Sequence, residues 1–211
     1  MVNKKGDIST EIRILEAAHK VFVKKGYAAA RMEDIAKEAG INRALLHYYF
    51  RSKDKMFDII FNQHFGEVLS GLGEMIKTEM SFEQRLKGII EVYHNKFTSH
   101  PDLPLFVIHE LAQNPKRLVE LIEKLPVGED GSKAKLAVAF KAIVQKEVNA
   151  GRIKPIDGMQ LLMNILALII YPFIAKPIFQ FVMQINDNDY KSMLSKRKEG
   201  IFEFIMNALK P

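Results

Sequence analysis

The chain has 211 residues, enough for one or two domains with a sizeable buried core. Its 48% hydrophobic and 27% charged residues are ordinary for a globular protein and exclude a disordered one, and the absence of cysteine excludes disulfides, thiolate zinc sites, iron–sulfur clusters and a cysteine nucleophile. Residues 1–55 carry 12 basic and 7 acidic side chains, whereas the other 156 residues carry 19 and 18. The net charge of +6 is therefore concentrated in the first quarter, which indicates either a polyanion-binding module or a solvated lysine-rich face.

Helical periodicity runs through almost the whole chain, and no segment alternates with period two for long enough to predict a strand. Four helices are expected in the first third, each with its own cap or stop signal. They cover residues 11–25, 32–39, 43–50 and 53 to about 69, with Thr10, Asn42 and Ser52 as N-caps and Gly26 and Gly40 as stops.

Six further helices are expected in the rest of the chain. Ser81 and Gln84 have the spacing of a capping box, and Pro115 suits the first position of a helix. The predicted helices cover residues 82–98, 105–114, 115–125, 133–150, 157–183 and 189–209, with a linker at 99–104 and a turn at 127–132. We expect the domain boundary near the start of the fourth helix, which gives domains 1–55 and 56–211.

The longest apolar run, Ile165–Ile174, is not expected to cross a membrane. Asn164 precedes it, Pro172 lies within it, and Lys176-Pro177 interrupts the apolar residues after it, whereas a span needs about 20 apolar residues. A buried helix is the better interpretation. The first ten residues are polar and no apolar run comes after them, so no signal peptide is expected either.

Residues 32–50 have the pattern of a helix-turn-helix. Gly40 allows the positive φ that reverses the chain, Asn42 can cap the second helix, and small residues such as Ala36 let the two helices approach closely. In such a motif the second helix enters the major groove of DNA, where the first turn meets base edges. The side chains expected to pack inside are Ile35, Ala36, Ala39, Ile41, Leu45 or Leu46, Tyr49 and Phe50.

The second helix of this motif presents groups suited to DNA. Arg43 has the planar fork that binds guanine O6 and N7 together, and it lies in the first turn between Asn42 and Ala44. His47, Tyr48 and Tyr49 offer donors for phosphates, although Tyr49 fits a core position equally well. Lys53 is expected to meet the DNA backbone at the start of the next helix.

The chain resembles the DNA-binding domain of the TetR family of bacterial transcriptional regulators over residues 9–57, without a gap. The resemblance rests on Gly26-Tyr27, Asp34-Ile35-Ala36, Ala39-Gly40-Ile41, Leu46, Tyr49-Phe50 and Ser52-Lys53. It implies an all-α fold with a three-helix DNA-binding domain and a C-terminal ligand-binding and dimerisation domain. It also implies a cytoplasmic homodimer that binds an inverted repeat in double-stranded DNA and is released by a small apolar or amphipathic inducer.

Three positions differ from the family pattern. Ala30 and Arg31 stand where the family usually has a capping threonine or serine, and Arg31 can contact phosphate by charge. Ala44 and Leu45 replace a small residue and a threonine, and Leu45 can contact a thymine methyl group. His47 replaces a tyrosine. These changes affect which operator is read rather than whether DNA is bound.

The resemblance also implies sites in the C-terminal domain. Aromatic residues and one histidine on the middle helices are candidates to line an apolar pocket, although aromatics at helical spacing are more often core: Phe61, Phe65, Tyr93, Phe97, Phe106 and His109. The last two helices carry more apolar surface than one bundle face needs. The candidates for a dimer interface, some of which must be intrachain core, are Ile165, Leu168, Ile169, Phe173, Ile201, Phe202 and Ile205.

The sequence favours a regulator over other function classes. It contains no nucleophile elbow, phosphate loop or zinc-protease motif, and no histidine spacing typical of a metal site, so neither an enzyme nor a cofactor is predicted. A helical small-molecule or lipid-binding protein with an unused helix-turn-helix is the alternative, and the charge on the first module favours DNA. The sequence predicts a repressor but does not separate it from an activator of the same fold.

Overall fold

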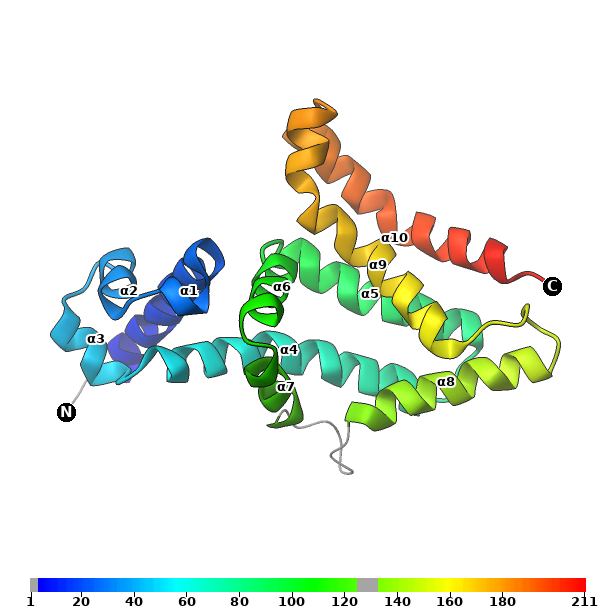
Figure 1. The fold of residues 1–211 in the computed structure, drawn as a ribbon, viewed down its shortest axis with the longest axis horizontal. Helices are drawn as coiled ribbons and strands as arrows, with labels where there is room; N and C mark the ends of the chain where they lie inside the picture. The colour runs from blue at the N-terminus through cyan, green and yellow to red at the C-terminus, as the bar shows by residue number, and fades with distance from the viewer. Residues whose placement is uncertain (1–3, 125–132) are drawn as a thin grey trace. The chain divides into compact units, whose positions relative to one another are not determined.

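The computed structural model describes residues 4–124 and 133–211 (Figure 1). All regular elements within these ranges are helices, which confirms the predicted all-α fold; the turn predicted at 127–132 lies outside them. The elements are α1 (Lys4–Ala29), α2 (Met32–Glu38), α3 (Arg43–Tyr49), α4 (Lys53–Lys77), α5 (Phe82–Ser99), α6 (Leu103–Gln113), α7 (Pro115–Lys124), α8 (Lys133–Asn149), α9 (Gly158–Ile174), the π-helical turn η1 (Ile178–Val182) and α10 (Asp187–Leu209).

Most of the predicted helix caps are confirmed. Ser52 Oγ accepts a hydrogen bond from the Lys55 N–H at 3.3 Å, at the start of α4. Ser81 and Gln84 form the reciprocal capping box of α5, with bonds of 3.1 and 3.0 Å between each side chain and the other's N–H. The last helix is capped by Asn186, whose side chain accepts from two backbone N–H groups. These bonds satisfy donors that have no partner within a helix.

The start of α1 differs from the prediction. The helix begins at Lys4, so the prediction that Thr10 caps it is wrong. Threonine lowers helix stability by less than about 1 kcal/mol relative to alanine, so a residue suited to capping can also lie inside a helix. The predicted stop at Gly26 is a bend with φ 73° and ψ 161°, a conformation open to glycine, and one further short turn comes after it.

The described residues form two compact units. The first contains residues 4–66 and 105–124, and the second contains 67–104 and 133–211. The core of the first unit combines one helix face from each of α1 to α4 with an aromatic side chain of α6. The buried side chains of this core include Ile14, Phe22, Ile35, Leu46, Phe57, Phe61 and Phe106. The predicted boundary between residues 55 and 56 falls inside α4 and stays a prediction.

In the second unit α9 packs against α5, α8 and α10, and α5 also packs against α10. Because α9 is covered on three sides, it is apolar around most of its circumference. Its neighbours contribute the buried side chains Leu86, Ile89, Ile90, Phe140, Val144, Ile201 and Ile205. No helix in the described ranges is both long and apolar enough to cross a bilayer.

The apolar segment predicted as one helix to about residue 183 is divided. Helix α9 ends at Ile174, and the separate turn η1 covers Ile178–Val182. Lys176-Pro177 lies at this division, and Pro177 has no N–H to donate to the carbonyl of Phe173 four residues earlier.

A second proline, Pro172, lies inside α9 and deprives the Leu168 carbonyl of its helical donor. A side chain from α10 replaces that donor, since Arg197 Nη2 donates to the Leu168 carbonyl at 3.1 Å. The Tyr190 hydroxyl donates to the carbonyl of Pro172 itself at 2.7 Å. Two polar side chains of α10 therefore complete the hydrogen bonding of the last turns of α9.

This arrangement predicts that Arg197→Met destabilises the chain by about 1–3 kcal/mol, because the Leu168 carbonyl is left without a partner. The free energy of unfolding in urea measures the effect. Pro172→Ala restores the missing N–H, so Arg197→Met should have a much smaller effect in that background. An equal effect in both backgrounds would show that the Leu168 bond is not its cause.

Candidate nucleic-acid interface

The turn between α2 and α3 has the geometry that the sequence predicts. Gly40 has φ 64°, in the left-handed region. Its N–H donates to the Lys37 carbonyl at 3.2 Å, and the Ile41 N–H donates to the Ala36 carbonyl at 3.0 Å, which is the paired bonding of a Schellman motif. The Asn42 side chain then accepts from the Leu45 N–H at 2.8 Å and starts α3. These bonds fix the angle at which α3 leaves α2.

Helix α3 has one buried face and one open face. Leu46 is fully buried, whereas Leu45 and Tyr48 expose 38% and 76% of their surface. The open face of α3 therefore presents one aliphatic and one aromatic side chain to solvent. His47 and Tyr49 are half-buried, and the rings of Tyr48 and Tyr49 meet edge to face at 5.3 Å between centroids. The residues open to solvent on α3 are Arg43, Ala44, Leu45 and Tyr48.

Arg43 is held by polar partners within the motif. Its Nη1 forms an ion pair with Glu33 Oε1 at 2.8 Å, and its Nε donates to His47 Nε2 at 3.3 Å. Arg43 and Glu33 are both exposed, and ion pairs of this kind contribute only about 0–1 kcal/mol. The guanidinium can therefore exchange Glu33 for another acceptor at little cost.

The start of α2 lacks a hydroxyl cap, and Asp34 takes its place. The Arg31 N–H donates to Asp34 Oδ2 at 3.1 Å, and Lys25 Nζ lies 2.7 Å from Asp34 Oδ1. The bond from Lys25, and next the bond from the Arg31 N–H, lower the pKa of Asp34 below its ordinary value. The Arg31 side chain itself is exposed. The sequence signal that predicts this cap is an acidic residue at the third helical position.

Lys53 is engaged with the backbone of its own chain. Its Nζ donates to the carbonyls of Tyr27, Ala30 and Ala28 at 2.8, 3.0 and 3.3 Å. These bonds were not expected from the sequence. The signal that could have indicated them is the glycine at position 26, which leaves carbonyls without partners where it bends α1.

The candidate ligand-lining residues are divided between the two units. In the first unit Phe61 and Phe106 are buried, and Phe65 stacks on Phe61 with 4.3 Å between ring centroids. His109 lies against the bend of α1, so close that a Cβ at Gly26 would be 2.2 Å from its Nε2. In the second unit the ring centroids of Tyr93 and Phe97 lie 5.8 Å apart. Burial raises the pKa of Tyr93 to about 12. Their role in ligand binding stays a prediction.

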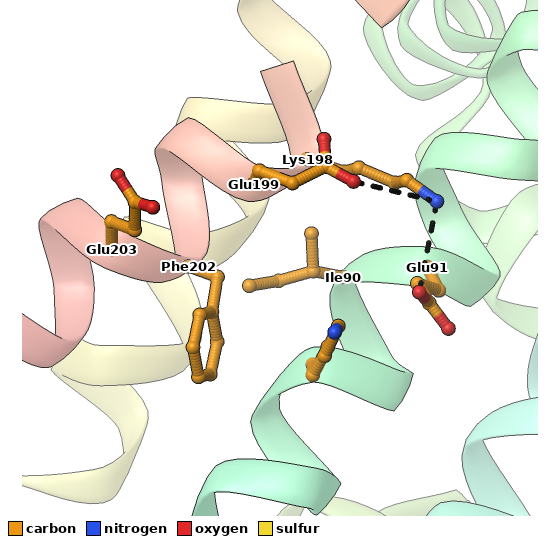
Figure 2. Close-up of a pocket in the computed structure, with 7 residues that line it drawn as sticks. Ile90, Glu91, Lys198, Glu199, Phe202 and Glu203 are labelled. Carbon is orange, nitrogen blue, oxygen red and sulfur yellow. Dashed lines mark ion pairs between the residues drawn. The ribbon is translucent and has the colours of Figure 1, made fainter. Parts of the chain in front are cut away.

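The second unit has a charged pocket between α5 and α10, with a volume of about 230 Å³ (Figure 2). Lys198 lies between two carboxylates, with its Nζ 3.7 Å from both Glu91 Oε1 and Glu199 Oε1. The apolar side chains at this pocket are Ile90 and Phe202, so one predicted interface residue lines a pocket within the chain. Among the described residues, no group of three histidine or carboxylate side chains is arranged to hold a metal.

Most of the candidate interface residues belong to the core of the second unit. Ile165, Ile169, Ile201 and Ile205 expose 3% of their surface or less, and Phe173 exposes 9%. Leu168 and Phe202 are half-buried. A side chain already enclosed by its own chain adds little to contact with a second one. Between residues 157 and 209, the large apolar side chains that are exposed are Met159, Met163, Tyr171, Ile178, Phe181, Val182, Met183, Met193 and Phe204.

Residues 14–60 match the family model for bacterial regulatory proteins of the tetR family, and they enclose the whole helix-turn-helix. The chain is a TetR-family transcriptional regulator. The match confirms the resemblance that the sequence predicts over residues 9–57.

Relatives of this TetR-family chain match it to different extents. The transcriptional activator FasR of Mycolicibacterium smegmatis is 33% identical over 88 residues, which are 42% of this chain and 40% of that protein. The fatty acid metabolism regulator protein of Bacillus subtilis is 22% identical over 198 residues, 94% of each chain.

The solved structure of the regulator FadR from Bacillus subtilis in complex with stearoyl-CoA has the same fold as this TetR-family chain. The TM-score is 0.60 at 20% identity, over 93% of this chain and 98% of that one. This likeness supports the predicted two-domain, all-α architecture.

Proposed function

We propose that this TetR-family chain is a ligand-responsive repressor that binds an inverted-repeat operator as a homodimer and has no enzymatic activity. The observation that carries the DNA-binding part is the open face of α3, where Arg43, Leu45 and Tyr48 face solvent on a helix fixed by the Gly40 turn. Such a helix fits the major groove, and the excess positive charge of residues 1–55 attracts the phosphates.

Because most of the predicted interface residues on α9 and α10 are buried within the chain, we propose that exposed side chains of these two helices form the dimer interface. A groove of about 320 Å³ lies between α9 and α10, and its lining includes Asn164, Ala167 and Ala208. Phe204 lines the same groove and exposes 64% of its surface. In a two-fold interface the same surface of each copy packs against the other. Here the exposed aromatic ring of one copy can pack over the small side chains of the second copy, and the reverse. We therefore propose that this groove lies at the centre of the dimer interface.

The ligand proposal is drawn from the names of two similar proteins and from the composition of this chain. One similar protein is named for fatty acid metabolism, and one similar structure holds stearoyl-CoA. This chain has 14 phenylalanines and 10 methionines, which suit an adaptable apolar pocket. A long-chain fatty acyl-CoA is therefore the first inducer to test.

The test is operator binding with and without such a ligand. The chain should protect an inverted repeat in DNA upstream of its own gene, and stearoyl-CoA should weaken that binding about 5–150-fold, the usual range of allosteric coupling. Coenzyme A alone is the matched control and should have no effect. Binding to DNA without a response to acyl-CoA would exclude this ligand class alone. Absence of DNA binding would favour the helical binding-protein alternative.

A further inference from the structure

The ammonium group of Lys53 has no hydrogen-bond donor left for DNA. A lysine ammonium has three donors, and the three carbonyls of Tyr27, Ala28 and Ala30 accept from it within 3.3 Å. The same nitrogen lies 4.4 Å from the centre of the Tyr27 ring, within the range of a cation–π interaction. Lys53 is also half-buried. A phosphate would have to displace several of these contacts.

The carbonyls that Lys53 meets need such a partner. These carbonyls belong to the last turn of α1, after the bend at Gly26, and to Ala30 just beyond it, and the last carbonyls of a helix have no donor within it. They also carry the negative end of the helix dipole, which a cation stabilises. Lys53 therefore acts as a C-terminal cap for α1, supplied from the start of α4.

A second contact joins the same two segments. The Tyr27 hydroxyl donates to the carboxylate of Asp54, the residue after Lys53. Two consecutive side chains of α4 thus hold the 27–30 turn, one through its carbonyls and one through Tyr27. We call this set of contacts the Lys53 clamp.

The clamp ends directly beside a predicted DNA contact. Ala30, whose carbonyl Lys53 binds, precedes Arg31, the N-cap residue of α2 with an exposed guanidinium. We propose that Lys53 is a positioning residue and not a phosphate ligand: it ties the first turn of α4 to the 27–30 turn and so sets the position of Arg31 on the DNA backbone. This inference rests on the proposed DNA-binding function. Through the clamp, a tilt of α4 moves Arg31.

The experiment compares Lys53→Met with Lys55→Met by measuring operator affinity as a function of salt, at a temperature where both variants are folded. Lys55 is exposed, lies in the same turn of α4, and is the matched control. Lys53→Met should weaken operator binding about tenfold, roughly 1.4 kcal/mol, without changing the salt dependence. Lys55→Met should reduce the slope of log affinity against log salt by about one for each phosphate that the variant no longer neutralises. A slope that falls equally in Lys53→Met would overturn the proposal.

Two further variants separate positioning from charge and from general stability. Lys53→Arg keeps the charge, but its planar fork does not converge on three carbonyls, so it should bind as weakly as Lys53→Met. Rescue by arginine would indicate a phosphate ligand. In an Arg31→Ala background, Lys53→Met should cause little further loss of operator affinity. Full additivity of the two losses would contradict positioning through Arg31.

The clamp is also testable without DNA. Hydrogen exchange of the amides at residues 27–31 should be faster in Lys53→Met than in Lys55→Met. If the wild-type chain binds no operator but this difference is present, the proposed function fails while the clamp remains. If the exchange rates are equal, the clamp itself is wrong.

Discussion

Phe204→Glu is expected to convert the dimer into a monomer and to lower operator affinity by a factor of about 100 or more. The reason is that a monomer binds one half-site at a time, whereas in a dimer the first bound subunit holds the second close to its half-site. Phe204 exposes 64% of its surface beside the groove between α9 and α10. At the centre of an apolar interface a carboxylate loses its water and meets the same charge on the second copy. In a free chain the substitution is harmless, since the position is exposed. Sedimentation at micromolar concentration and operator titration measure the two effects.

Val138→Glu is the matched control. Val138 exposes 67% of its surface on α8, so the same charge enters an equally exposed apolar position on a different helix. It should leave both the dimer and operator binding unchanged. If Phe204→Glu remains dimeric, the groove is not the interface. If Val138→Glu dissociates the dimer instead, the interface includes α8.

The helix-turn-helix was predictable because its signals are local. Gly40 and Asn42 determine the turn through their own backbone and side-chain bonds, with partners three residues away. The capping box of Ser81 and Gln84 is similar. In each case the residue type alone restricts the conformation or supplies the bond.

Long-range roles were not predictable from the same signals. Lys53 has the charge and the place of a phosphate ligand, but its acceptors lie 23 to 26 residues earlier in the chain. Arg197 likewise completes a helix whose broken carbonyl is 29 residues away. The sequence shows that a charged side chain needs hydrogen-bond partners. Which groups become those partners depends on how the helices pack.

The interface residues illustrate a different limit. Apolar periodicity indicates which side chains leave water but not whether they pack on their own chain or on another. Ile165 on α9 and Ile201 on α10 satisfy the pattern and are buried within the second unit, whereas Met163 and Phe204 on the same two helices stay exposed. The difference depends on which face of α9 the helices α5, α8 and α10 cover, and the pattern of one helix does not contain that information.

Arg43→Ala is expected to weaken operator binding by about 1–3 kcal/mol per half-site and to relax the preference at one base pair in each. The guanidinium lies in the first turn of α3, where side chains of a recognition helix reach base edges. In the free chain it pairs with Glu33 of α2 at 2.8 Å, and both side chains are exposed.

Two matched variants test whether Arg43 reads bases. Lys55→Ala removes an exposed positive charge from the first turn of α4, so it should weaken binding to all sequences alike and flatten the salt dependence. Glu33→Gln removes the competing carboxylate, so operator binding should be equal to or slightly tighter than that of the wild-type chain. Salt titrations on operator and on random DNA measure all three variants. Equal losses on both DNAs for Arg43→Ala would assign Arg43 to the backbone, and specificity would then depend on Leu45 and Tyr48, the next exposed large side chains on α3.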